Sequence, residues 1–141
     1  MSEAFACESL HHVSIPVTDL ERSRCFYRDV LGLPEIPRPP FDFPGAWFTL
    51  GPGGQQLHLI VYSGQTFRKP NSIETHDGHY ALRVPSFRRA VEHFLRLGYR
   101  EDSADPATLL IVRPHATAGF PQIYLLDPDR HVIEINAAAL D

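Results

Sequence analysis

Three histidines and one glutamate occupy repeated positions in this chain. When the second half of the sequence is aligned with the first, His12 corresponds to His79 and His58 corresponds to Glu134. Imidazole and carboxylate groups are common protein ligands of divalent transition metals. A duplicated unit with such a side chain at both of two equivalent positions points to one shared site. We predict that these four side chains bind one divalent metal ion.

The repeat behind these positions is visible in two pairs of segments. His12–Val17 is echoed by His79–Val84, and Phe48–Leu59 aligns without a gap to Tyr124–Ile135. The first segment of each copy is followed by apolar residues at helical spacing and then by a glycine, a common residue at helix ends. The sequence therefore predicts two modules with the same order of elements.

Strand periodicity indicates which way the four candidate ligands point. Each of them alternates with apolar residues, as His12 does with Val13, and successive side chains of a strand point to opposite faces. The apolar residues should pack on the helices, which leaves the four candidates on the open face. A single histidine there is more often a hydrogen-bonded core residue than a ligand. Four ligand-type residues at equivalent positions favour a metal, because a cation offsets the cost of burying a carboxylate.

The remaining pattern predicts a β-α-β-β-β order in each module. A capping box at Thr18–Glu21 is expected to begin the first helix, Ser86 to cap the second, and Gly32 and Gly98 to end them. The proline-rich loop 34–44 is expected to lie over the open face. The expected strands are 10–17, 46–50, 56–62, 79–84, 109–113, 122–126 and 132–136, with less regular ones near 33–36 and 99–101.

Composition limits the classes of function. The 141 residues carry a net charge of −4, which argues against nucleic-acid binding through a basic surface. No apolar run is long enough to span a membrane and no secretion signal is recognisable, so we expect a cytoplasmic protein without membrane contact. The two cysteines, Cys7 and Cys25, have neither zinc-knuckle spacing nor the number for a disulfide framework.

Three segments resemble the vicinal oxygen chelate superfamily, which includes glyoxalase I, bleomycin-resistance proteins and extradiol dioxygenases. They are Leu10–Leu33, Gly78–Val84 and Asp127–Ile135. The resemblance implies an α+β fold, in which two βαβββ modules in tandem form curved mixed sheets around a concave cleft. The corresponding limits are a single domain at 8–137, made of module 1 (8–62), a linker (63–76) and module 2 (77–137).

The resemblance also implies the ligand positions and the assembly. His12 and His79 stand at the first-strand metal positions of the two modules, and Glu134 at the carboxylate of the last strand. His58 departs from the pattern, since glyoxalase I carries Glu there. Members of the superfamily usually complete the cleft in a homodimer, so we expect one here.

Together with this ligand set, the resemblance implies a glyoxalase-like, divalent-metal-dependent lyase or isomerase acting on a small carbonyl substrate such as a thiol adduct. Glu134 is the candidate proton acceptor, and the metal could be Zn, Ni, Co, Fe or Mn. Two alternatives stay open: a metal-free, drug-sequestering protein of the bleomycin-resistance type, and an Fe(II) ring-cleaving dioxygenase. The candidate substrate-binding residues are Ser14, Arg38, Trp47, Arg83 and Arg113.

Overall fold

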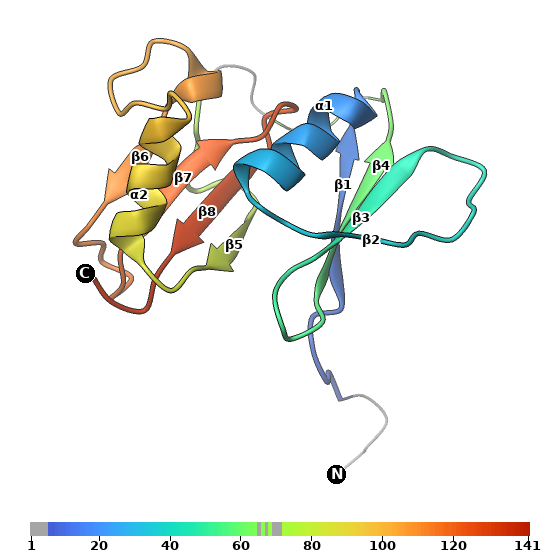
Figure 1. Cartoon of the computed structure of the whole chain (residues 1–141), viewed down its shortest axis with the longest axis horizontal. Coiled ribbons are helices and arrows are strands. Elements are labelled where there is room, and N and C mark those ends of the chain that lie inside the picture. Colours follow the sequence, from blue (N-terminus) through green and yellow to red (C-terminus); the bar gives the residue numbers. More distant parts are fainter. Residues whose placement is uncertain (1–5, 65, 67, 69–71) are drawn as a thin grey trace.

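The computed structural model of the chain describes residues 6–64, 66, 68 and 72–141, so part of the predicted linker lies outside the described residues. Two similar groups of strands, each with a helix packed on it, stand side by side (Figure 1). The elements, in chain order, are β1 (His12–Val17), α1 (Leu20–Cys25), the π-helical η1 (Phe26–Val30), β2 (Glu35–Ile36), β3 (Gly45–Thr49), β4 (Gln56–Val61), β5 (His79–Arg83), α2 (Phe87–Arg96), the 3-10 helix η2 (Pro106–Thr108), β6 (Ile111–Arg113), β7 (Gln122–Leu126) and β8 (Val132–Asn136).

The two sheets have the same topology. Their strand orders are β1-β4-β3-β2 and β5-β8-β7-β6. In each, the first strand of the module pairs in parallel with the last, and all other pairs are antiparallel. The predicted α+β fold of tandem βαβββ modules is confirmed. The strand expected near 99–101 is only an isolated bridge between Arg100 and Leu109.

The strand registers place the candidate ligands at the same offset in both sheets. His58 on β4 lies opposite Ser14, two residues along β1 from His12. Glu134 on β8 lies opposite Ala81, two residues along β5 from His79. Paired residues, and residues two apart on one strand, share a face of the sheet. The two candidates of each module therefore point to the same side of their sheet.

The first helix begins one residue later than the capping box predicts. Asp19 is its N-cap and accepts a hydrogen bond from the amide of Arg22, whereas the Thr18 hydroxyl donates to Asp129 of the other module. A short acceptor side chain suffices at either position, and here the contact between modules decides which residue caps. At the other end Gly32 adopts a φ of 68°, as expected of a helix-ending glycine.

The two modules share one hydrophobic core. It is formed by the helices and the helix-side faces of both sheets, and its fully enclosed members include Val17, Phe48, Leu59, Leu125 and Ile133. Because the apolar residues of both sheets meet the helices, the polar residues of the same strands lie on the opposite faces.

Polar contacts also join the modules beside α1, which lies between the two sheets in Figure 1. The β7–β8 turn, residues 127–131, contributes most of these contacts. They are Tyr27 Oη to Asp127 Oδ2 at 2.6 Å, the Thr18 amide and hydroxyl to Asp129 at 3.0 and 2.6 Å, His131 Nε2 to the Pro16 carbonyl at 2.7 Å, and His93 Nε2 to the Val30 carbonyl at 2.6 Å. His93 and His131 thus each contact a backbone carbonyl of the other module. No helix in the described part of the chain is long and apolar enough to cross a membrane.

Candidate metal centre

In the first module the two candidate histidines lie face to face. The ring centroids of His12 and His58 are 4.2 Å apart with an interplanar angle of 16°, and Trp47 stacks on the other side of His58 at 4.0 Å. His58 Nε2 is 2.8 Å from Gln56 Oε1, and His12 Nδ1 is 2.9 Å from Nδ1 of His11. Each histidine thus has one ring nitrogen held by a neighbour and the other available.

The surroundings of His58 favour a neutral ring. Burial, followed by the positive charges of His12, His11 and Arg38, lowers the pKa of the His58 imidazole. A neutral imidazole is the form of histidine that binds metals.

In the second module a hydrogen bond fixes the tautomer of His79. Its Nδ1 is 2.8 Å from the backbone carbonyl oxygen of Asp77, which can only accept, so Nδ1 carries the proton. In the neutral ring Nε2 then presents its lone pair, and Glu134 Oε1 is 3.5 Å from it. Two acceptor atoms face each other stably only when a cation, either a proton or a metal ion, lies between them. A backbone carbonyl behind a ligating histidine is a common arrangement in metal sites.

The Glu134 carboxylate is held as an anion. It is 5% exposed, and three side chains donate to it: Gln122 Nε2 at 3.1 Å and Tyr124 Oη at 2.8 Å to Oε1, and Asn136 Nδ2 at 2.5 Å to Oε2. Burial raises its pKa, but the bonds from Asn136 and Tyr124, the charge of His79 and the bond from Gln122 outweigh it, so the pKa of Glu134 is lowered. An ionised carboxylate is the form that a divalent cation binds.

One chain does not bring the two pairs together. Among the described residues, no three His, Cys, Asp or Glu side chains gather closely enough to hold a metal ion. The donor types suit such an ion, and the His79–Glu134 pair already points two donors at one place. Each module thus holds a pair of donors, which we call half-site 1 (His12 and His58) and half-site 2 (His79 and Glu134).

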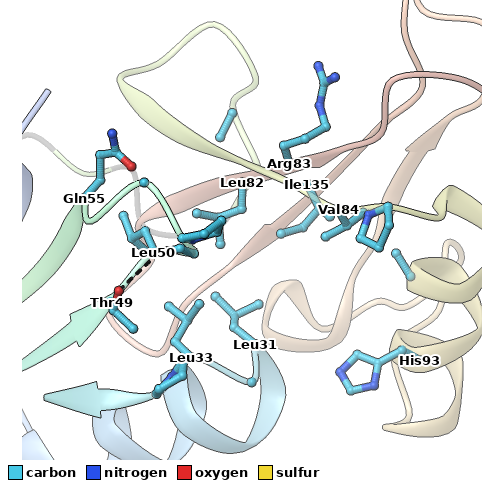
Figure 2. A pocket seen from close by; sticks show the side chains of 18 of the residues that line it. Leu31, Leu33, Thr49, Leu50, Gln55, Leu82, Arg83, Val84, His93 and Ile135 are labelled. Carbon is cyan, nitrogen blue, oxygen red and sulfur yellow. Dashed lines mark hydrogen bonds between the residues drawn. The ribbon is translucent and has the colours of Figure 1, made fainter. Parts of the chain in front are cut away.

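A large apolar cavity lies elsewhere. It has a volume of about 990 Å³, opens between the modules, and none of the four candidate ligands lines it. Figure 2 shows its wall of Leu31, Leu33, Leu50 and Leu82, with Arg83 extending away from them. This cavity is an apolar groove between modules rather than a place for metal chemistry.

The candidate substrate-binding residues of module 1 lie around half-site 1. Ser14 shares the face of His58, and Trp47 stacks on His58. The guanidinium of Arg38 lies 4.7 Å from the ring centre of Phe41 in the proline-rich loop, and Phe41 lies 6.0 Å from Trp47. That loop therefore extends along the open face of the first sheet, as predicted.

The two candidates of module 2 flank half-site 2. Arg83 donates from Nε to Asn136 Oδ1 at 2.5 Å, and Arg113 lies over the ring of Tyr124 at 5.4 Å from its centre. Arg83 therefore contacts Asn136, and Arg113 contacts Tyr124. Both Asn136 and Tyr124 donate hydrogen bonds to Glu134.

Sequence reasoning missed the residues that hold the candidate ligands. These residues share the open faces with the candidate ligands: Gln56 and Asn136 lie two strand positions from His58 and Glu134, Tyr124 pairs with Glu134, and Gln122 pairs with Asn136. Because side chains alternate along a strand, the sequence could have identified these four residues as neighbours of the candidate ligands. His11 gave no such signal, since it precedes the strand and its bond to His12 depends on the local turn of the chain.

Comparison with known proteins places the chain in a family. The sequence model of the Glyoxalase/Bleomycin resistance protein/Dioxygenase superfamily matches residues 9–135, and the chain belongs to that superfamily. It is 30% identical over 132 residues to "Glyoxylase I 4" of Arabidopsis thaliana, an alignment that covers 90% of this chain and 69% of that protein. It is 29% identical over 133 residues to the glutathione transferase FosA of Serratia marcescens, covering 94% and 83%.

A solved structure supports the fold. The fosfomycin resistance protein FosX of Listeria monocytogenes, in a mutant form complexed with Mn(II) and 1S,2S-dihydroxypropylphosphonic acid, superposes with a TM-score of 0.68. The sequences are 20% identical, and the match covers 96% of this chain and 95% of FosX. At this identity the likeness establishes the architecture of the two modules.

Proposed function

We propose that this protein is a divalent-metal-dependent lyase or isomerase acting on a small carbonyl substrate, with His12, His58, His79 and Glu134 as the metal ligands. The observation that carries the proposal is the pair of ligand-type atoms, His79 Nε2 and Glu134 Oε1, that face each other at 3.5 Å. The Asp77 carbonyl orients one of them and three donors hold the other as an anion.

The complete centre in this proposal is shared by two subunits of a homodimer. Half-site 1 and half-site 2 lie on different sheets that pack through their helix sides, so each open face needs a second face opposite it. Pairing half-site 1 of one subunit with half-site 2 of its partner would unite three imidazoles and one carboxylate. Two such centres would form in each symmetric dimer.

A bound divalent ion with open positions would supply Lewis-acid polarisation of a carbonyl or enolate oxygen. The residues of the chain would orient the substrate and handle the proton. Trp47 offers a flat apolar surface beside His58. Burial and the bond to Glu134 raise the pKa of Tyr124 to about 12, so its hydroxyl stays protonated and keeps donating to Glu134.

Glu134 is the proton acceptor in this proposal. Because its pKa is lowered, it is ionised at neutral pH and ready to take a proton at Oε1 or Oε2. The same lowering makes it a weak base, which suits a carbon acid that is already activated by a neighbouring polarised carbonyl.

The relatives favour this class over the two alternatives. One relative carries the name glyoxylase I, and FosX was solved with Mn(II). A metal-free sequestering protein has no need of the hydrogen bond from His79 Nδ1 to the Asp77 carbonyl, which fixes the tautomer of the ring. A ring-cleaving dioxygenase with two histidines and one carboxylate on Fe(II) leaves His58 without a role.

Metal analysis tests the proposal directly. Protein purified without chelator should contain about one divalent ion per chain by plasma mass spectrometry, and it should isomerise a 2-oxoaldehyde–thiol adduct. His79→Ala should lose the metal and keep the circular dichroism spectrum of the wild type. The matched control His131→Ala should keep the metal, since His131 contacts the other module. A wild-type protein without metal, and inert toward such adducts, would instead favour sequestration.

A further inference from the structure

The open face of the second sheet is cationic although the protein is acidic overall. The chain has a net charge of −4. By the strand registers, the face that carries Glu134 also carries His79, Arg83 and Arg113, and Glu134 is its one carboxylate among the described strand residues. Segregation of charge against the net sign of a protein attracts ligands of the opposite sign.

The two arginines lie at the ends of one row of side chains. Arg113, Gln122, Asn136 and Arg83 are paired in sequence across β6, β7, β8 and β5. Asn136 binds Arg83, and both amides of the row also donate to Glu134. Gln122 therefore links the Arg113 end of this row to half-site 2, since it pairs with Arg113 on the neighbouring strand and donates a hydrogen bond to Glu134.

A cavity of about 560 Å³ opens at the Arg113 end. Arg113, His76, His115 and Gln122 line it, together with the short residues of the loop after β6, and no Asp or Glu is among its lining residues. Among the described residues, the carboxylate closest to any of the three basic side chains is that of Glu74, whose Oε1 is 3.7 Å from His76 Nδ1. In the described part of the chain Arg113 has no carboxylate partner, and its guanidinium rests on the ring of Tyr124.

We propose that this cavity, which we call the Arg113 pocket, binds a carboxylate or other oxyanion carried by the substrate. The guanidinium offers the paired N–H donors that such a group accepts, and the two imidazoles add further donors. This inference rests on the proposed function only for its link to the substrate, and binding of the anion itself requires no metal.

The registers also give the separation that a substrate would span between Glu134 and Arg113. Glu134 and Arg113 are separated by two strands and by two residues along the strand, so their backbones lie roughly 12 Å apart. Both side chains shorten that gap. The substrate class is therefore a carbonyl compound whose anionic group lies several bonds from the reacting carbonyl, for example across an aromatic ring.

Anion binding can be tested on chelator-treated protein with inorganic phosphate as the probe. Phosphate should shift the backbone amide signals of residues 115–118 in NMR spectra, and the shifts should saturate. Arg113→Ala should weaken phosphate binding by about tenfold or more, whereas Arg96→Ala, an exposed arginine of α2, should leave it unchanged. Equal binding in Arg113→Ala and the wild type, or shifts that never saturate, would overturn the proposal.

A second measurement links the pocket to the substrate. With the metal-loaded protein, Arg113→Ala should raise KM for the mercaptoethanol adduct of 4-carboxyphenylglyoxal by about tenfold and leave KM for the phenylglyoxal adduct unchanged. Equal changes for both adducts would contradict recognition of the carboxylate. If phosphate binds as expected but neither adduct turns over, the Arg113 pocket stands and the proposed isomerase activity fails.

Discussion

At the scale of single residues, Glu134 is held more firmly than a surface carboxylate. Both of its oxygens already accept hydrogen bonds from protonated donors, and one of them also faces His79. A side chain fixed in this way is pre-organised as a ligand, because little conformational freedom is left to lose when an ion arrives.

Glu134→Gln tests both roles of this residue. The amide oxygen can still coordinate weakly, but it accepts no proton at neutral pH. We expect turnover of a 2-oxoaldehyde–thiol adduct to fall below detection, and metal affinity to fall about 10- to 100-fold, measured by competition with a chromogenic chelator. Turnover close to that of the wild type would refute the role of Glu134 as proton acceptor.

We also predict that His11 supports metal binding by orienting His12. It holds Nδ1 of His12 at 2.9 Å, which leaves Nε2 of His12 to face an ion. His11→Ala should weaken metal binding by about tenfold while metal-dependent turnover survives at saturating metal. His12→Ala is the matched comparison and should lose both. Equal losses in the two variants would show that His11 is itself a ligand.

At the scale of elements, hydrogen bonds from the β7–β8 turn stabilise the packing of the two modules. The carboxylate of Asp129 accepts bonds from the Thr18 amide and hydroxyl, and the Ser23 hydroxyl lies 3.5 Å from it. Asp129 is 6% exposed, so its removal would leave these donors without a partner.

Asp129→Ala should therefore lower the free energy of unfolding by about 3 kcal/mol, as measured by urea denaturation. The control Asp102→Ala removes an exposed carboxylate and should change it by less than about 0.5 kcal/mol. If the two substitutions were equally mild, the turn would contribute nothing to the joining of the modules.

The sequence predicts these elements better than it predicts their contacts. Alternation of side chains identifies the strands and their open faces, and the duplicated register of His12 with His58 and of His79 with Glu134 follows from the repeat. The cap at Asp19 was missed because the alternative, Thr18, is recruited by a residue more than a hundred positions away. No local pattern encodes such a contact.

At the scale of the whole molecule, the packing of the modules separates the half-sites. The shared core and the bonds from the β7–β8 turn fix the two sheets by their helix sides, so the open faces are not closed on each other within one chain. Sequence alone left open whether the modules pair within a chain or between chains, because both arrangements bury the same strand faces.

Mixing two inactive variants distinguishes these arrangements. His12→Ala damages half-site 1 and His79→Ala damages half-site 2. A mixed dimer would contain one centre with both defects and one with neither, so unfolding and refolding an equimolar mixture should restore about a quarter of the wild-type activity. Centres contained within single chains would show no recovery.

The separation of the half-sites has a consequence for the concentration at which the protein works. If neither half-site suffices alone, specific activity must fall on dilution as dimers dissociate, even when metal and substrate are saturating. Far below the dissociation constant of the dimer, total activity would rise with the square of the protein concentration. A cell could then set the output of this protein steeply through its expression level, with no effector molecule.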